Sequence, residues 1–278
     1  MSAPAIFDRA ARRRRRDRAA AVFPSHDFLR AAMLDGIGER LSAVTRGFGD
    51  VLDLGCFDGA FSAPPPVRIA RVDAGFRFAR AAGGMQADED RLPFADGAFD
   101  LVVSAGVLDQ IDDLPGALTL ARRALRPDGL FLAALVGAGS FPVLRSALQA
   151  AERDRPAARL HPQIDVRSAG DLLVRAGFAL PVADTETLDI GYPSLGRLLE
   201  DLRGMAGTNL LAERRPLTRG ALVRAAAAFA DAAAPDGRTR ERIEIVFLTG
   251  WSPDPSQPRP ARRGSGAASL AQALRPKS

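Results

Sequence analysis

Short apolar runs alternate with helical patterns through the middle of the chain. Runs of the kind that buried strands show lie at 51–54, 67–73, 85–88, 99–108 and 130–136. Between the last two runs, apolar side chains recur at helical spacing over 114–125, and Pro127 and Gly129 follow as stop signals. Strands that alternate with helices pair in parallel through crossover connections. The pattern therefore predicts an α/β fold with a Rossmann-like, doubly wound sheet.

Helical patterns also flank this region. Residues 1–46 begin as a polar arm and continue as an amphipathic helix with apolar positions from Phe28 to Leu41. Beyond the fifth strand, the pattern predicts helices at 168–178, near 194–206 and near 218–234, and strands at 180–190 and 242–251. We therefore expect three parts: a helical arm (1–46), a sheet domain with a helical lid inserted at about 190–235 (47–251), and an irregular tail (252–278).

The amino-acid composition excludes several kinds of protein and of site. The single cysteine, Cys56, leaves no intrachain disulfide and no cysteine-rich metal site. Lys277 is the only lysine, which excludes a phosphate-binding lysine loop. No apolar run is long enough for a transmembrane segment, and no secretory signal follows the early arginines. The cysteine usage fits a reducing compartment, so we expect a cytoplasmic protein.

Positive charge is concentrated in one run, Arg12–Arg16. The net charge of +5 invites a nucleic-acid interpretation, but most of the cations are arginines interspersed with acids, so we expect no nucleic-acid partner. The run forms either a solvated helical arm or an arm that lies over an anionic partner or closes a pocket. Peripheral contact with a membrane through this run stays open.

Acids and glycines follow the predicted strands at their carboxyl ends. Ligands of open parallel sheets bind beyond these ends. Asp53 lies in the first run, and the glycines that follow it let a ligand approach the backbone closely. Asp73 ends the second strand, where a carboxylate can accept hydrogen bonds from both ribose hydroxyls. Asp88 follows the third strand and can meet an adenine amino group, and Ser104 ends the fourth.

These features resemble, in order, the class I S-adenosylmethionine-dependent methyltransferases. "VLDLGCFDG" corresponds to their first glycine motif, Asp73 to their ribose acid, and "DEDRLPFADGAFDLVVS" to their adenine loop and fourth strand. The resemblance implies a seven-stranded sheet whose last strand is antiparallel, and S-adenosylmethionine as the cofactor. It also implies these cofactor-binding residues: Asp53, Gly55, Gly59, Asp73, Asp88, Leu92 and Ser104.

Other segments narrow the resemblance. "YPSLGRLLEDLRGMAGTNLLAERR" and "GWSPDPSQPRP" are similar to the bacterial relatives of mitochondrial complex I assembly factor 5, near the malonyl-acyl-carrier-protein methyltransferases of biotin synthesis. This similarity implies a methyltransferase that acts on a protein or a small acyl substrate. The mitochondrial member is linked to hydroxylation of an arginine on a complex I subunit. A protein-arginine hydroxylase and a non-catalytic assembly factor for respiratory complex I are therefore the alternatives.

The inserted helices supply candidate substrate contacts. Tyr192, Arg203 and Asn209 are expected to line the substrate mouth, with helix-surface ion pairs as the alternative. Tyr192, the only tyrosine, is the one candidate acid or base, although in-line methyl transfer depends mostly on positioning. The only histidines, His26 and His161, fall in unrelated segments, so no metal site is expected.

The sequence departs from the family pattern at three places. Phe57 stands where the glycine motif usually has a glycine, and Pro64–Pro66 leave room for at most about one helical turn before the second strand. Asp109 and Gln110 stand where an aromatic or histidine pair is usual after the fourth strand. We expect the adenosine half of the pocket to be kept, and a working or a degenerate methionine half stays open.

Overall fold

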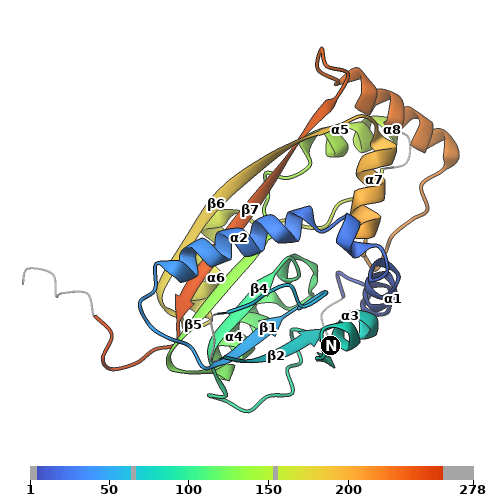
Figure 1. Ribbon diagram of the computed structural model, residues 1–278. Helices are drawn as coiled ribbons and strands as arrows, with labels where there is room; N and C mark the ends of the chain where they lie inside the picture. Colours follow the sequence, from blue (N-terminus) through green and yellow to red (C-terminus); the bar gives the residue numbers. More distant parts are fainter. Residues whose placement is uncertain (1–4, 64–66, 153–155, 259–278) are drawn as a thin grey trace, which may run out of the picture.

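The computed structural model describes residues 5–63, 67–152 and 156–258. A seven-stranded sheet in the order β3-β2-β1-β4-β5-β7-β6 forms its centre (Figure 1). The strands are β1 (Asp50–Leu54), β2 (Arg68–Asp73), β3 (Met85–Gln86), β4 (Phe99–Ala105), β5 (Leu125–Val136), β6 (Ala179–Tyr192) and β7 (Thr239–Trp251). Strands β1 to β5 pair in parallel, whereas β7 runs antiparallel to both β5 and β6. The predicted α/β sheet with an antiparallel last strand is confirmed.

Helices cover both faces of the sheet. They are α1 (Arg9–Ala19), α2 (Phe28–Ser42), α3 (Phe76–Ala81), α4 (Leu114–Ala124), α5 (Pro142–Ala151), α6 (Val166–Arg175), α7 (Leu195–Gly204) and α8 (Arg219–Asp231), with short 3₁₀ turns η1 (Phe23–Ser25) and η2 (Leu108–Gln110). Buried side chains of α2, α5, α7 and α8 pack on one face, and those of α3, α4 and α6 on the other. No helix in these described ranges is long and apolar enough to cross a membrane.

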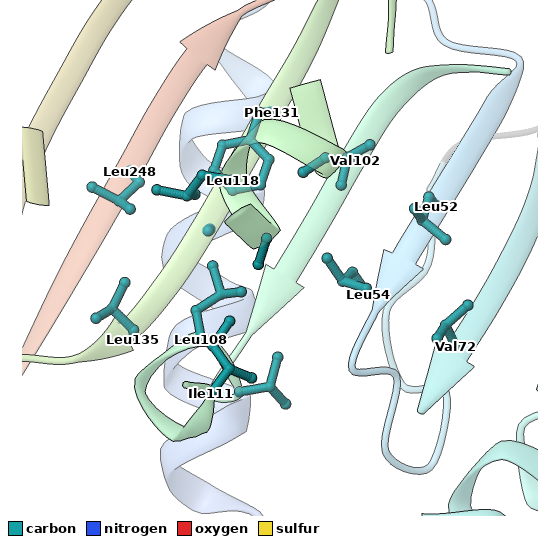
Figure 2. Packing of buried hydrophobic residues seen from close by; sticks show 14 of the residues in the cluster. Leu52, Leu54, Val72, Val102, Leu108, Ile111, Leu118, Phe131, Leu135 and Leu248 are labelled. Carbon is teal, nitrogen blue, oxygen red and sulfur yellow. The ribbon is translucent and has the colours of Figure 1, made fainter. Parts of the chain in front are cut away.

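Side chains along each strand point alternately to the two faces of the sheet, so the core has two layers. Leu52, Leu54 and Val102 point to the face that α4 covers, where Leu118 and Phe131 join them (Figure 2). Their neighbours along the same strands point to the opposite face and pack under α2 and α7: these are Val51, Leu101 and Val103. Because successive strand residues face opposite sides, a continuous apolar run fits a sheet that is covered on both faces.

Several element boundaries differ from the predictions. Strand β5 begins at Leu125, where the backbone becomes extended and pairs with Phe99, so Pro127 and Gly129 lie inside the strand and not before it. Strand β4 ends at Ala105 instead of 108, because Gly106 turns the chain with a positive φ. Helix α5 was not predicted. It begins with Pro142 after a residue in left-handed conformation, Phe141, and has no side-chain cap that would announce it.

The connection between β1 and β2 contains no helix in its described residues, 55–63 and 67. This agrees with the expected shortening, although Pro64–Pro66 themselves lie outside the described residues. The described part of the tail, 252–258, is irregular and is fixed by hydrogen bonds from Ser252 N to Gly129 O (2.8 Å) and from Gln257 Nε2 to Asp128 Oδ1 (3.0 Å). Within the expected lid range, 190–235, lie the end of β6, α7 and α8. The division into three parts stays a prediction.

Candidate functional site

The glycine turn after β1 is closed against β2. The amides of Gly55 and Cys56 both donate to the carbonyl of Val72, at 2.8 and 2.9 Å. Gly55 has a φ of 81°, and a Cβ at this position would lie 2.5 Å from the side chain of Val107. Glycine is therefore required here, both for the backbone conformation and for the close approach of the chain after β4.

Asp73, at the end of β2, is completely buried and accepts four hydrogen bonds. Two come from Arg16 of α1, with Nε at 2.8 Å from Oδ1 and Nη2 on Oδ2. Two come from the amides of Phe57 (2.9 Å) and Gly75 (2.7 Å). Burial raises the pKa of Asp73, but the Arg16 guanidinium and the two amides outweigh it and hold the pKa below its ordinary value.

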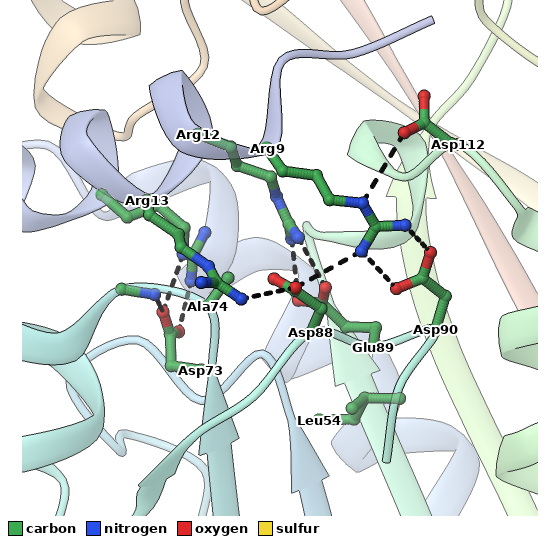
Figure 3. Close-up of polar contacts among 12 residues, drawn as sticks. Arg9, Arg12, Arg13, Leu54, Asp73, Ala74, Asp88, Glu89, Asp90 and Asp112 are labelled. Carbon is green, nitrogen blue, oxygen red and sulfur yellow. Dashed lines mark hydrogen bonds and ion pairs between the residues drawn. The ribbon is translucent and has the colours of Figure 1, made fainter. Parts of the chain in front are cut away.

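The acids after β3 are also paired with arginines of α1 (Figure 3). Arg12 binds Glu89 through two bonds of 2.6 and 2.7 Å, and both side chains are buried. The other pairs are Arg13 with Asp88 (2.6 Å) and Arg9 with Asp90 (2.7 Å) and Asp88 (3.3 Å). The run Arg12–Arg16, for which a solvated arm was one expectation, thus places Arg12 and Arg16 in the interior.

Phe57 packs into the core between the N-terminal arm and α3. Its ring stacks on Phe23 at 4.8 Å and meets Phe78 edge-on at 5.3 Å. The guanidinium of Arg16 lies 3.9 Å from the ring centroid, and that of Arg30 lies 4.6 Å away. Phe57 has a φ of 49°, in the left-handed region that glycine favours. The loop therefore keeps a glycine-like backbone while the side chain fills the space beside Asp73.

Asp53 is buried next to Arg30 without a hydrogen bond to either carboxylate oxygen. Its Oδ1 lies 3.7 Å from Arg30 Nη2, and burial raises the pKa of Asp53 to about 6. The guanidinium of Arg30, from α2, donates to the carbonyls of Gly55, Cys56 and Ala105 at 2.9–3.0 Å. Arg30 thereby joins α2 to the turns after β1 and β4.

The remaining residues expected to bind the cofactor pack against neighbouring parts of the chain. Ser104 is buried and its hydroxyl donates to the carbonyl of Leu54 at 2.9 Å. Leu92 is partly buried against the core beneath α4, and Gly59 lies next to Ala82 and Arg71. The structure therefore brings Asp53, Asp73 and the glycine turn together, with Asp88 linked to them through α1. The cofactor contacts themselves stay a prediction.

A cavity of about 150 Å³ lies between α2, α5, α7 and the turn after β4. Its walls are mostly apolar, with Leu29, Met33, Leu144, Leu199 and Leu202 among them. Phe57, Asp109 and Gln110 also line the cavity, which therefore adjoins the glycine turn. The cavity therefore lies beyond the carboxyl ends of the strands, which is where ligands of open α/β sheets bind.

Three buried polar atoms of the cavity residues have no hydrogen-bond partner: Arg30 Nε, Asp109 Oδ1 and Gln110 Oε1. Burial raises the pKa of Asp109 to about 6. The sequence marked Asp109 and Gln110 only as a departure from the family pattern. Buried polar atoms in proteins are nearly always hydrogen-bonded, so these three atoms can bond to a polar group that enters the cavity.

The predicted lid residues separate in the structure. Asn209 lines the cavity and donates to the carbonyl of Ala158 at 3.2 Å, whereas Arg203 is exposed on α7. Tyr192 is buried on another side of α7, outside the cavity lining, in a hollow that also includes Asp201. Burial raises the pKa of Tyr192, which opposes its use as a base.

The two histidines have different surroundings. His26 Nδ1 lies 2.8 Å from Asp201 Oδ1 on α7. His161 lines the cavity, packs edge-on against Phe7, and its Nε2 accepts a hydrogen bond from Leu210 N at 2.9 Å. Neither role follows from the local sequence. Among the residues that the structure describes, no group of three or more His, Cys, Asp or Glu side chains is arranged to hold a metal ion.

Several known proteins are similar to this chain in sequence or in fold. Residues 52–133 match a family described as "Methyltransferase domain". The structure resembles YcgJ of Bacillus subtilis (TM-score 0.55, 17% identity, 79% of this chain and 99% of that one). It also resembles an S-adenosylmethionine-dependent methyltransferase of Thermotoga maritima (TM-score 0.51, 15% identity, 86% and 99%). At these identities the structures show the fold alone. Together with the matched domain, they show that the chain has the class I methyltransferase fold.

Closer relatives place the chain within this class. "Arginine-hydroxylase NDUFAF5, mitochondrial" of Danio rerio is 34% identical over 96% of this chain and 88% of its own length, and the protein of that name from Homo sapiens is 32% identical over 96% and 83%. "Malonyl-[acyl-carrier protein] O-methyltransferase" of Laribacter hongkongensis is 30% identical over 85% and 87%. The chain belongs to the S-adenosylmethionine-dependent methyltransferase family that contains these proteins.

S-adenosylmethionine is the cofactor of this family. The chemistry of the strand-end residues fits its adenosine part, because carboxylates at Asp73 and Asp88 can accept hydrogen bonds from ribose hydroxyls and an adenine amino group. In the structure, however, Arg16 and Arg13 of α1 hold these same carboxylates. These acceptors therefore fit the cofactor, but in the structure α1 occupies Asp73, so its carboxylate is not free to receive the ribose.

Proposed function

We propose that this protein is an S-adenosylmethionine-dependent enzyme that modifies an arginine side chain of a protein. In this proposal Asp73 and Asp88 hold the adenosine part of the cofactor, and the cavity beside Phe57 receives the substrate side chain. Asp53, with a pKa raised to about 6, lies behind the glycine turn and shapes it through Arg30. When bound, the cofactor would supply the methyl group; the residues of the chain position the acceptor and exclude water.

The unpaired acceptors Asp109 Oδ1 and Gln110 Oε1 are the observation that favours an arginine side chain as the substrate. An arginine side chain has an apolar stem, which matches the walls of the cavity, and a planar head with five N–H donors. A malonyl group carries a carboxylate and would need a free cation instead. Two cations also line the cavity: Arg159 is paired with Glu152, and Arg30 donates to three backbone carbonyls and lies 3.7 Å from Asp53, which leaves only its Nε without a partner. The cavity therefore suits the arginine named for the NDUFAF5 relatives better than the malonyl group named for the others.

Asp109 also has a role in the chemistry of this proposal. A guanidinium loses a proton when it accepts a methyl group, and a carboxylate with a pKa of about 6 can receive that proton at neutral pH. The rate of modification should therefore rise as the pH rises through about 6, since the carboxylate form of Asp109 is the one required.

Hydroxylation of the arginine is the second candidate reaction, because a relative that matches 96% of the chain bears the name arginine-hydroxylase. The expected partner, a subunit of respiratory complex I, and the cytoplasmic location stay part of the proposal. Both reactions use the same substrate cavity. Methylation transfers the methyl group of the cofactor and releases a proton, whereas hydroxylation inserts one oxygen atom and would consume molecular oxygen and two electrons from an external reductant.

Two measurements test the proposal. Calorimetry with S-adenosylmethionine should show binding that is lost in Asp73→Asn and kept in Asp100→Asn, a carboxylate at the other end of the sheet. Intact-mass analysis of a co-expressed complex I subunit should show a modified arginine with the native chain and an unmodified one with Asp109→Asn, whose cofactor binding should be unchanged. Binding without any change in mass would contradict the catalytic role, and absence of binding in every variant would leave a scaffold without cofactor.

A further inference from the structure

Helix α1 presents one face of arginines to the strand ends. Arg9, Arg12, Arg13 and Arg16 follow the spacing i, i+3, i+4 and i+7, which places them on a single face of a helix. That face meets the acids Asp73, Asp88, Glu89 and Asp90 in the ion pairs described above (Figure 3). Arg14 and Arg18 lie outside this face and are exposed.

The contact at Asp73 leaves no acceptor capacity for another ligand. An ionised carboxylate has about four lone-pair positions. At Asp73 these four are taken by Arg16 Nε, Arg16 Nη2, Phe57 N and Gly75 N. The side chains of Arg16 and Asp73 are 1% and 0% exposed, so a ribose cannot reach this carboxylate around the guanidinium.

We propose that α1 is an internal occupant of the cofactor site: its guanidinium groups hold Asp73 and Asp88 in place of the ribose hydroxyls and the adenine amino group, and S-adenosylmethionine binds only after α1 has moved away. This inference rests on the proposed function, in which these two acids are cofactor ligands. It makes the N-terminal helix a competitive, built-in regulator of that site.

The packing of α1 suits such a movement. Its buried apolar side chains are only two alanines, Ala11 and Ala19, so the helix is held mainly by polar contacts. Little buried apolar area favours local opening, whereas the buried ion pairs of Arg12 and Arg16 oppose it, so the closed position of α1 should predominate without cofactor. The segment before the helix is held by more contacts: Phe7 packs with Leu210 and Leu211 and forms a β-bridge with Leu211, Asp112 Oδ1 accepts hydrogen bonds from the amides of Ile6 and Phe7, and Asp8 pairs with Arg214 at 2.9 Å. This segment is therefore the fixed end from which α1 moves.

Movement of α1 would also change the substrate cavity. Arg15 Nη1 donates to Thr208 Oγ1 at 2.9 Å and to the carbonyl of Asn209. Thr208 and Asn209 both line the cavity. The same displacement that frees Asp73 therefore releases one wall of the cavity, so cofactor entry and access of a substrate side chain are coupled through α1.

The first test compares Arg16→Gln with Arg14→Gln in the full chain. Both remove one positive charge from α1, but only the first removes the bonds to Asp73. Calorimetry should show that Arg16→Gln binds S-adenosylmethionine about tenfold more tightly than the native chain, whereas Arg14→Gln stays within about twofold. Hydrogen exchange of 9–19 in the native chain should increase on cofactor binding. Weaker binding by Arg16→Gln, or increased protection of α1 with cofactor, would overturn the inference.

If Arg16→Gln fails to fold, a reversible disulfide between α1 and α3 provides a second test. Asp17 Oδ1 accepts a hydrogen bond from Arg77 N at 2.8 Å, which brings α1 and α3 together. The double variant Asp17→Cys/Arg77→Cys should bind S-adenosylmethionine when reduced and at least tenfold more weakly when its disulfide is formed. Cys56 is buried and its thiol pKa is raised, so it does not compete. Equal binding in both states overturns the inference alone; binding in neither state, nor in the native chain, overturns the proposed function as well.

Discussion

At the scale of single residues, position along the strands identified the acids but not their partners. Asp73 ends β2 and Asp88 follows β3, as the spacing in the sequence predicts. Their partners, Arg16 and Arg13, lie 57 and 75 positions away in the sequence. The spacing of the arginines at 9, 12, 13 and 16 is the one local signal that these side chains share a face, and it does not say what that face meets.

His161 yields a prediction about pH. Burial lowers the pKa of His161 to about 4, from an ordinary value of 6.5. Because the folded state disfavours the protonated ring, the stability it contributes is full above pH 6.5 and is lost as the pH falls toward 4. Between pH 7.5 and 5.0 the free energy of unfolding of the native chain should fall by about 1–2 kcal/mol more than that of His161→Gln.

Urea unfolding of both proteins at the two pH values measures this difference. The other titrating groups are the same in the two chains, so their contributions cancel in the comparison. Equal losses of stability would show that the ring of His161 is free to protonate in the folded protein.

At the scale of elements, caps and apolar spacing located most helices within a few residues. Helix α6 begins at Val166, two residues before its predicted start, because Asp165 caps it by accepting a hydrogen bond from Ser168 N at 2.9 Å. Helix α5 escaped prediction because its start depends on Phe141, which takes a left-handed conformation and donates its amide to the carbonyl of Arg242 on β7. A start fixed by a strand about 100 residues away leaves no local cap signal.

The cap of α6 is open to a direct test. Asp165→Ala removes the acceptor for Ser168 N and also for Ser168 Oγ (2.7 Å), and should lower the free energy of unfolding by about 1 kcal/mol. Asp171→Ala, an exposed change inside the same helix, should alter it by less than about 0.5 kcal/mol. Denaturant unfolding of the two variants provides the comparison, and similar values would show that the cap does not stabilise α6.

At the scale of the whole molecule, Phe57 connects three parts of the chain. Its ring packs against Phe23 from the N-terminal arm and Phe78 from α3, under the guanidinium of Arg16. A side chain at this position would crowd the methionine part of the cofactor unless the loop is rebuilt. In the structure the ring is buried in the core and also lines the cavity, and whether the methionine half of the pocket works stays a prediction.

Removal of this ring should therefore destabilise the whole protein. Phe57→Ala leaves the backbone conformation as it is and deletes a buried aromatic side chain, which typically costs about 3–5 kcal/mol. Phe76→Ala removes the same group at a position that is 53% exposed and should cost less than about 1 kcal/mol. Urea unfolding measures both. A loss below about 1 kcal/mol for Phe57→Ala would show that the three aromatic rings do not stabilise one another.

The sequence by itself determined the strands, the strand-end acids and the family, since these depend on local periodicity and on motifs a few residues long. The antiparallel last strand followed from the family resemblance. Tertiary structure alone decided that α1 lies on the acids, that the cavity collects Asp109, Gln110, His161 and Asn209, and that the five-arginine run is partly buried. The physical reason is that the energy and the role of a buried charge or an unpaired acceptor depend on the group that it contacts. Those groups come from distant parts of the chain.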